Sequence, residues 1–128
     1  MPVRSLRSSV FRWPARSAVL EAARAWAARE APRQAGAQRL GIFGSAARED
    51  WGVGSDLDLI AIVTGSDRPF EERALAWDLL SLPVPAEILI YTQTEWDALQ
   101  AEGGRFARTI EREAIWIWDI NATAGAES

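Results

Sequence analysis

The chain has 128 residues, which is enough for one domain with one hydrophobic core. With 48% hydrophobic and 25% charged residues it has the composition of a folded globular protein, and the absence of cysteine and histidine excludes disulfides, zinc sites built from these residues and an imidazole base. All 14 basic residues are arginine and the net charge is −4, so there is no P-loop lysine and no direct nucleic-acid binding is expected. Catalysis must therefore use carboxylates, hydroxyls or arginine.

The first 14 residues differ from the rest of the chain because they are basic. Arg4, Arg7 and Arg12 occur here without any acidic residue, and we interpret residues 1–14 as a flexible or docking arm. A mitochondrial transit peptide has a similar Arg- and Ser-rich composition and is the alternative. No apolar run approaches the ~18 residues of a membrane span, so the sequence predicts a cytoplasmic protein without a membrane partner.

Helix and strand patterns alternate along the first half of the domain. Small and apolar residues such as Val19 and Trp26 recur at helical spacing and predict an amphipathic helix over residues 15–30. A short apolar run at 39–43 predicts a strand that leads into a turn, and residues 45–50 are expected to form a single helical turn.

Three further apolar runs predict strands, at residues 56–63, 86–91 and 115–118. Between the first two, residues 69–81 have a helical composition. Between the last two, a helix is expected over 94–113, with a break at paired glycines.

The order of these elements indicates an α/β (α+β) fold in which a small mixed β-sheet has helices mainly on one face. Residues 15–120 are expected to form this domain. Residues 121–128 are small and polar and are expected to be a disordered tail.

Two aspartates open the strand predicted for residues 56–63. Alternate residues of a strand point to one face, so Asp56 and Asp58 project together. At about 4 Å two carboxylates repel by about 4 kcal/mol at an effective dielectric near 20, which favours a raised pKa or a bound cation. Without histidine or cysteine, the expected ion is Mg²⁺ or Mn²⁺. Glu87 completes the cluster if its strand lies beside this one, which would supply a two-metal site.

Gly44 and Ser45 supply the complementary part of the site. Glycine allows a phosphate to approach the backbone, and N–H groups at a helix start together with a hydroxyl can bind phosphate oxygens. Each of these features alone is common in surface turns, and it is their order and spacing that indicates phosphoryl transfer.

Two motifs carry a resemblance to a known family. Gly-Ser-Ala-Ala-Arg at 44–48, followed by Gly-Ser-Asp-Leu-Asp-Leu-Ile at 54–60, resembles the G-S-x-A-R…S-D-x-D-L signature of the DNA polymerase β-like nucleotidyltransferase superfamily, in particular its minimal nucleotidyltransferases. The similarity continues through residues 86–92, the family's third-carboxylate strand, and covers roughly residues 18–119. It implies the polymerase β-like fold and Mg²⁺-dependent transfer of a nucleoside monophosphate, with ATP as the expected donor of AMP.

The resemblance also implies roles for individual residues. The expected catalytic residues and ligands of two Mg²⁺ or Mn²⁺ ions are Asp56, Asp58 and Glu87, with Glu87 also assisting the acceptor hydroxyl. The expected nucleotide-binding residues are Gly44, Ser45, Arg48 and Ser55. The family usually has Asp at the third acidic position, and the extra methylene of Glu87 can displace its oxygens by about an ångström, which can cost on the order of 100-fold in rate.

The partner is also an expectation from the resemblance. No second domain is evident to hold an acceptor, and minimal nucleotidyltransferases commonly serve as antitoxins that attach AMP to a small helical HEPN-domain RNase. The chain is therefore expected to be a protein adenylyltransferase in a hetero-oligomer with such an RNase. The alternatives are a small-molecule (aminoglycoside-type) nucleotidyltransferase and a catalytically weak antitoxin that acts by binding alone.

Seven tryptophans allow specific expectations about packing. Trp26 and Trp77 are expected in the core. Trp51 lies between the two motifs and is expected either to pack in the core, to stack on a base or to line the mouth of the cleft. Trp116 and Trp118 are expected to share one face of the last strand, where they would pack in the core or form a protein interface.

Overall fold

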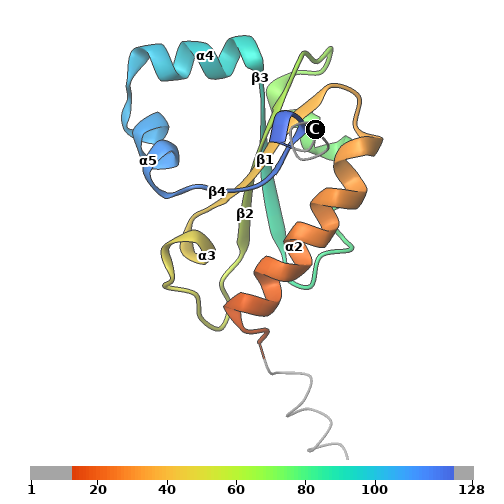
Figure 1. The fold of residues 1–128 in the computed structure, drawn as a ribbon, viewed down its shortest axis with the longest axis vertical. Helices are drawn as coiled ribbons and strands as arrows, with labels where there is room; N and C mark the ends of the chain where they lie inside the picture. The colour runs from red at the N-terminus through yellow and green to blue at the C-terminus, as the bar shows by residue number, and fades with distance from the viewer. Residues whose placement is uncertain (1–12, 123–128) are drawn as a thin grey trace, which may run out of the picture.

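A four-stranded mixed β-sheet organises the protein in the computed structural model, which describes residues 13–122 (Figure 1). The strands, in the order in which they lie side by side, are β3 (Ala86–Thr92), β2 (Leu57–Val63), β1 (Ala37–Phe43) and β4 (Ile115–Asp119). Strand β1 is antiparallel to both β2 and β4, whereas β2 and β3 are parallel. The predicted mixed α/β class is confirmed.

Helices cover both faces of this sheet. Because side chains alternate along β2, Leu57, Leu59 and Ala61 enter one apolar cluster and Ile60 and Ile62 enter another. The main cluster also includes residues of α2 (Arg16–Glu30). The second cluster includes residues of α4 (Gln93–Glu102) and α5 (Arg105–Glu113). Figure 1 shows α2 on one side of the strands and α4 and α5 on the other, so the helices are shared between the faces instead of lying mainly on one.

Both ends of α4 have capping motifs that can be recognised in the sequence. Its first turn is closed by a capping box, in which the Thr92 hydroxyl accepts from the Glu95 N–H and the Glu95 carboxylate accepts from the Thr92 N–H. Its last turn ends at Gly103, which has a left-handed backbone with φ of 65°. The expected break between two helices is thereby confirmed.

The segment predicted to be helical at 69–81 forms a 3₁₀ helix, η2 (Phe70–Ala76), followed by turns. Its composition favours a helix, but its apolar residues do not form one continuous buried face, because Leu75 and Leu80 are exposed while Trp77 is buried. The buried Arg73 side chain also joins the segment to its neighbours, because it donates hydrogen bonds to the Ile90 carbonyl oxygen and to the Glu95 carboxylate.

The last strand contains an irregularity that separates its two tryptophans. Trp118 pairs with Leu40 and Trp116 with Gly41, so the register shifts between adjacent residues of β1. Trp116 packs against the second cluster and Trp118 against the main one. The prediction that they share one face is wrong, because an extra residue in one strand of a pair reverses the alternation of side chains beyond it.

The remaining expectations concern the core and the two ends of the chain. Trp26 and Trp77 are buried, as predicted, with ring centroids 6.1 Å apart. The predicted arm and tail lie outside the described residues, except for Trp13 and Pro14 at one end and residues 121–122 at the other. Trp13 packs against the main cluster. Between residues 13 and 122, no helix is long and apolar enough to cross a membrane.

Candidate active site

The pairing of β1 with β2 brings the two sequence motifs together. Phe43, the last residue of β1, lies opposite Asp58 near the start of β2. Since the strands are antiparallel, the end of β1 and the start of β2 meet at the same edge of the sheet. Beyond Phe43 the chain turns at Gly44 into the short helix α3 (Ser45–Arg48), which therefore stands beside Asp56 and Asp58.

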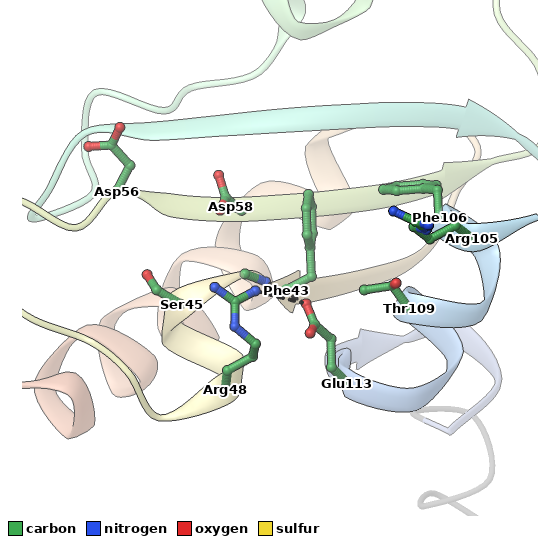
Figure 2. A pocket seen from close by; sticks show the side chains of 10 residues that line it. Phe43, Ser45, Arg48, Asp56, Asp58, Arg105, Phe106, Thr109 and Glu113 are labelled. Carbon is green, nitrogen blue, oxygen red and sulfur yellow. Dashed lines mark hydrogen bonds and ion pairs between the residues drawn. The ribbon is translucent and has the colours of Figure 1, made fainter.

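A cavity of about 730 Å³ lies at this edge (Figure 2). Its walls come from β1, α3, β2 and α5. The lining residues are Phe43, Gly44, Ser45, Arg48, Asp56, Asp58, Arg105, Phe106, Thr109 and Glu113. In Figure 2, the two aspartates and Ser45 lie toward one end of the cavity, and the α5 residues Arg105, Phe106 and Thr109 lie at the other. A volume in this range is typical of sites for nucleotides and other small molecules.

Only glycine fits at position 44. Its backbone has φ of 78° and ψ of −153°, a conformation that residues with a side chain rarely adopt. A Cβ atom built at this position would also collide with the carboxylate of Asp58. The backbone of the turn therefore lies directly against the Asp58 carboxylate, so the turn and the start of β2 meet at this point of the cavity wall.

The electrostatics of the cavity centre on Asp58. Its pKa is raised, first by burial and then by the negative charges of Glu87 and Asp56, with a smaller contribution from Glu113. Arg48 acts in the opposite direction. Three acidic side chains, Glu87, Asp56 and Glu113, thus act on Asp58 against one arginine, Arg48, which is the condition under which a bound cation stabilises the ionised carboxylates.

The donors at this site fit an oxygen-preferring divalent cation. Asp56 and Asp58 line the same cavity, and the pKa of Asp58 is raised by burial first and then by the negative charges of Glu87 and Asp56. Across residues 13–122, no three acidic side chains stand in an arrangement that would hold one ion together. Glu87 lies opposite Asp58 in the parallel pairing of β2 and β3, but its side chain is exposed and outside the cavity lining.

The other residues expected at the site have different placements. Ser45 and Arg48 line the cavity. Ser55 does not, and its hydroxyl accepts a hydrogen bond from the Gly52 N–H at 3.0 Å within the loop. Trp51 also lies outside the lining: it packs against the main cluster and its indole N–H donates to the Pro14 carbonyl oxygen at 2.9 Å. Of the expectations for Trp51, core packing is therefore the one that the structure supports.

Helix α5 contributes four lining residues that the sequence analysis did not single out. These are Arg105, Phe106, Thr109 and Glu113. Phe106 packs edge-to-face on Phe43 with ring centroids 6.0 Å apart, which forms an aromatic part of the wall. Their spacing is that of one helix face, a signal visible in the sequence, but nothing local shows that this face meets the two motifs.

Comparison with known proteins identifies the class to which this fold and site belong. Residues 26–117, well over half of the chain and including both motifs, match the profile described as a nucleotidyltransferase domain. The chain belongs to this nucleotidyltransferase domain family.

A solved structure supports the same assignment of the fold. A candidate nucleotidyltransferase from Sulfolobus solfataricus is similar with a TM-score of 0.60 and 18% sequence identity, over 83% of this chain and 85% of that chain. At this identity the likeness is evidence for the fold alone. No curated protein sequence has significant similarity to the chain.

Proposed function

We propose that this nucleotidyltransferase moves AMP from ATP onto a hydroxyl group of a protein partner. The observation that carries the nucleotide half of the proposal is the meeting of the Gly44–Ser45 turn with Asp56 and Asp58 in one cavity. Backbone groups, a hydroxyl and an arginine on one side, with paired carboxylates on the other, are the parts that a triphosphate and its cations need.

In this proposal Ser45 and Arg48 hold phosphate oxygens, and Asp56 and Asp58 hold the divalent cations. A bound Mg²⁺ would neutralise charge on the phosphates and position them for in-line displacement. The acceptor oxygen bonds to the α-phosphorus while the bond from that phosphorus to the bridging oxygen breaks and pyrophosphate leaves. Glu87, beside Asp58 on the next strand, is the proposed acceptor of the hydroxyl proton.

The protein acceptor is proposed from the resemblance and from the open side of the cavity. Resemblance to minimal nucleotidyltransferases suggests a HEPN-type RNase, with the chain as its antitoxin in a hetero-oligomer. The cavity is formed by a single sheet and its helices, and no additional domain within residues 13–122 covers it, so a partner surface can close it.

Specific observations favour two alternatives. The α5 end of the 730 Å³ cavity, with Arg105 and Thr109, has room for a small-molecule acceptor of the aminoglycoside type. The exposed position of Glu87 outside the lining favours a catalytically weak antitoxin that acts by binding alone.

The test is to co-express the chain with a candidate HEPN RNase and to measure the mass of the purified RNase. The expected result is an increment of one AMP for each modified hydroxyl, which disappears when Asp56→Asn and Asp58→Asn are combined. The double variant should remain folded by circular dichroism and should lose Mg²⁺-dependent ATP binding in calorimetry. An RNase that is inhibited but unmodified would support the binding-only alternative, and transfer to an aminoglycoside would support the small-molecule one.

A further inference from the structure

A carboxylate of α5 that also lines the cavity holds the Gly44–Ser45 turn. Glu113, the last residue of that helix, accepts a hydrogen bond from the Gly44 N–H at a nitrogen–oxygen distance of 2.9 Å. The same carboxylate oxygen lies 3.7 Å from a guanidinium nitrogen of Arg48, at the other end of α3. The Glu113 side chain is only 13% exposed, whereas the Arg48 side chain is 50% exposed, so Glu113 is the shielded partner of this pair.

Helix α3 has little to stabilise it internally. It is a single turn of four residues, its N-cap is Gly44, and no side chain caps its first N–H groups. It ends at Glu49 in a left-handed backbone conformation with φ of 69°. One turn of helix is not stable by itself, because few hydrogen bonds compensate for the lost backbone freedom.

Neighbouring elements supply what the turn lacks. The Arg16 guanidinium of α2 donates to the Ala46 carbonyl oxygen on one side of α3, and Glu113 of α5 holds Gly44 and Arg48 on the other. Glu113 is itself fixed because β4 follows two residues later and Ile115 pairs with Ile42 of β1. The turn is therefore braced between two helices that lie on opposite faces of the sheet.

We infer that Glu113 is a positioning residue for the nucleotide site: its carboxylate fixes the Gly44–Ser45 turn and Arg48 relative to Asp58. This inference rests on the proposed function, since it assigns Ser45 and Arg48 to nucleotide phosphate. Glu113 acts through these residues and holds no phosphate itself, because its own negative charge would repel one. A displacement of the turn by about 1 Å can cost on the order of 100-fold in rate. The contacts of Glu113 therefore affect the reaction rate more than the energy of one hydrogen bond would indicate.

The experiment uses three variants of the full chain, each examined by NMR and by calorimetry with Mg²⁺ and a non-hydrolysable ATP analogue. Glu113→Ala removes the acceptor and the charge. Glu113→Gln keeps an oxygen that can accept from the Gly44 N–H. Glu111→Ala is the matched control, because Glu111 is on the same helix turn but is exposed and outside the cavity lining.

In Glu113→Ala, the Gly44 amide proton signal should move upfield and the affinity for the analogue should fall by about tenfold or more. Glu113→Gln should keep a hydrogen-bonded Gly44 amide and recover most of the affinity. Glu111→Ala should match the wild type in both measurements. A general loss of stability would not produce this difference between the alanine and glutamine variants.

Several results would overturn the inference. One is a Gly44 amide signal that does not change in Glu113→Ala. Another is tighter analogue binding by Glu113→Ala, which would mean that the carboxylate competes with phosphate for the turn. A third is equal weakening by the alanine and glutamine variants. If the wild-type chain fails to bind the analogue, the proposed function is contradicted, while the Gly44 amide signal still decides whether Glu113 braces the turn.

Discussion

At the scale of single residues, the close approach of Gly44 to Asp58 restricts position 44 to glycine. Gly44→Ala should lower the free energy of unfolding by about 1 to 3 kcal/mol from backbone strain alone, and the added Cβ should also push the Asp58 carboxylate out of place. Mg²⁺-dependent ATP binding should therefore fall by about tenfold or more, as measured by calorimetry.

Gly54 provides the control for this substitution. It has a similar φ of 85°, but a Cβ atom there would meet nothing within 4 Å. Gly54→Ala should therefore show a comparable backbone cost and little change in ATP binding. Equal ATP affinity in the two variants would contradict the placement of phosphate beside Gly44.

At the scale of elements, a half-buried ion pair joins η2 to β3 and α4. The Arg73 guanidinium donates to both carboxylate oxygens of Glu95, at 2.6 and 3.0 Å, and to the carbonyl oxygens of Ile90 and Arg68 at 3.0 Å. Arg73→Met should lower the free energy of unfolding by about 2 kcal/mol. This loss is smaller than for a fully buried ion pair because the Glu95 side chain is 42% exposed and water screens the interaction. Urea unfolding with Arg29→Met, an exposed arginine of α2, as control would measure the difference.

The same pair predicts a pH dependence. The Arg73 hydrogen bond, followed by that of the Thr92 backbone, lowers the pKa of Glu95 from 4.5 to about 2. A carboxyl group whose pKa is lower in the folded state stabilises the fold above its unfolded pKa, and this contribution is lost as the pH falls from about 4.5 toward 2. In thermal unfolding at several pH values, Glu95→Gln should be less stable than the wild type at pH 7, and the gap should narrow over that range. A gap that is constant with pH would mean that ionisation of Glu95 contributes nothing.

At the scale of the whole molecule, the two faces of the sheet have different relations to the site. Ile110 is fully buried in the second cluster and anchors α5, which carries part of the cavity wall. Ile110→Ala should cost about 2 to 5 kcal/mol of stability and should also weaken ATP binding. Val63 is buried in the main cluster at the far end of β2. Val63→Ala should lower the free energy of unfolding by about 1 to 3 kcal/mol without affecting ATP affinity. Parallel calorimetry and urea unfolding of both variants would check this, and an equal effect on binding would contradict the link through α5.

The sequence by itself determined the features that depend on neighbours along the chain. The apolar run of β2 follows from strand geometry, with Asp58 in the strand and Asp56 directly before it, and the glycine break after α4 follows from backbone sterics. The Gly44–Ser45 turn was predicted from the residue types that a phosphate site needs. The strands, the glycine break after α4 and the Gly44–Ser45 turn were accessible for this reason, whereas the segment at 69–81, which was predicted to be helical, forms the 3₁₀ helix η2 and turns.

Only the tertiary structure decided which residues far along the chain join the Gly44–Ser45 turn and the two aspartates at the site. Glu113 reaches Gly44 because α5 packs on the second cluster and β4 pairs with β1, an arrangement that is set by the burial of both sheet faces and not by any local pattern. The register of β4 likewise placed Trp116 and Trp118 on opposite faces, and the β2–β3 pairing left Glu87 beside Asp58 but outside the cavity. Such contacts depend on the free energy of the whole packed chain, in which one shifted register changes every side chain beyond it.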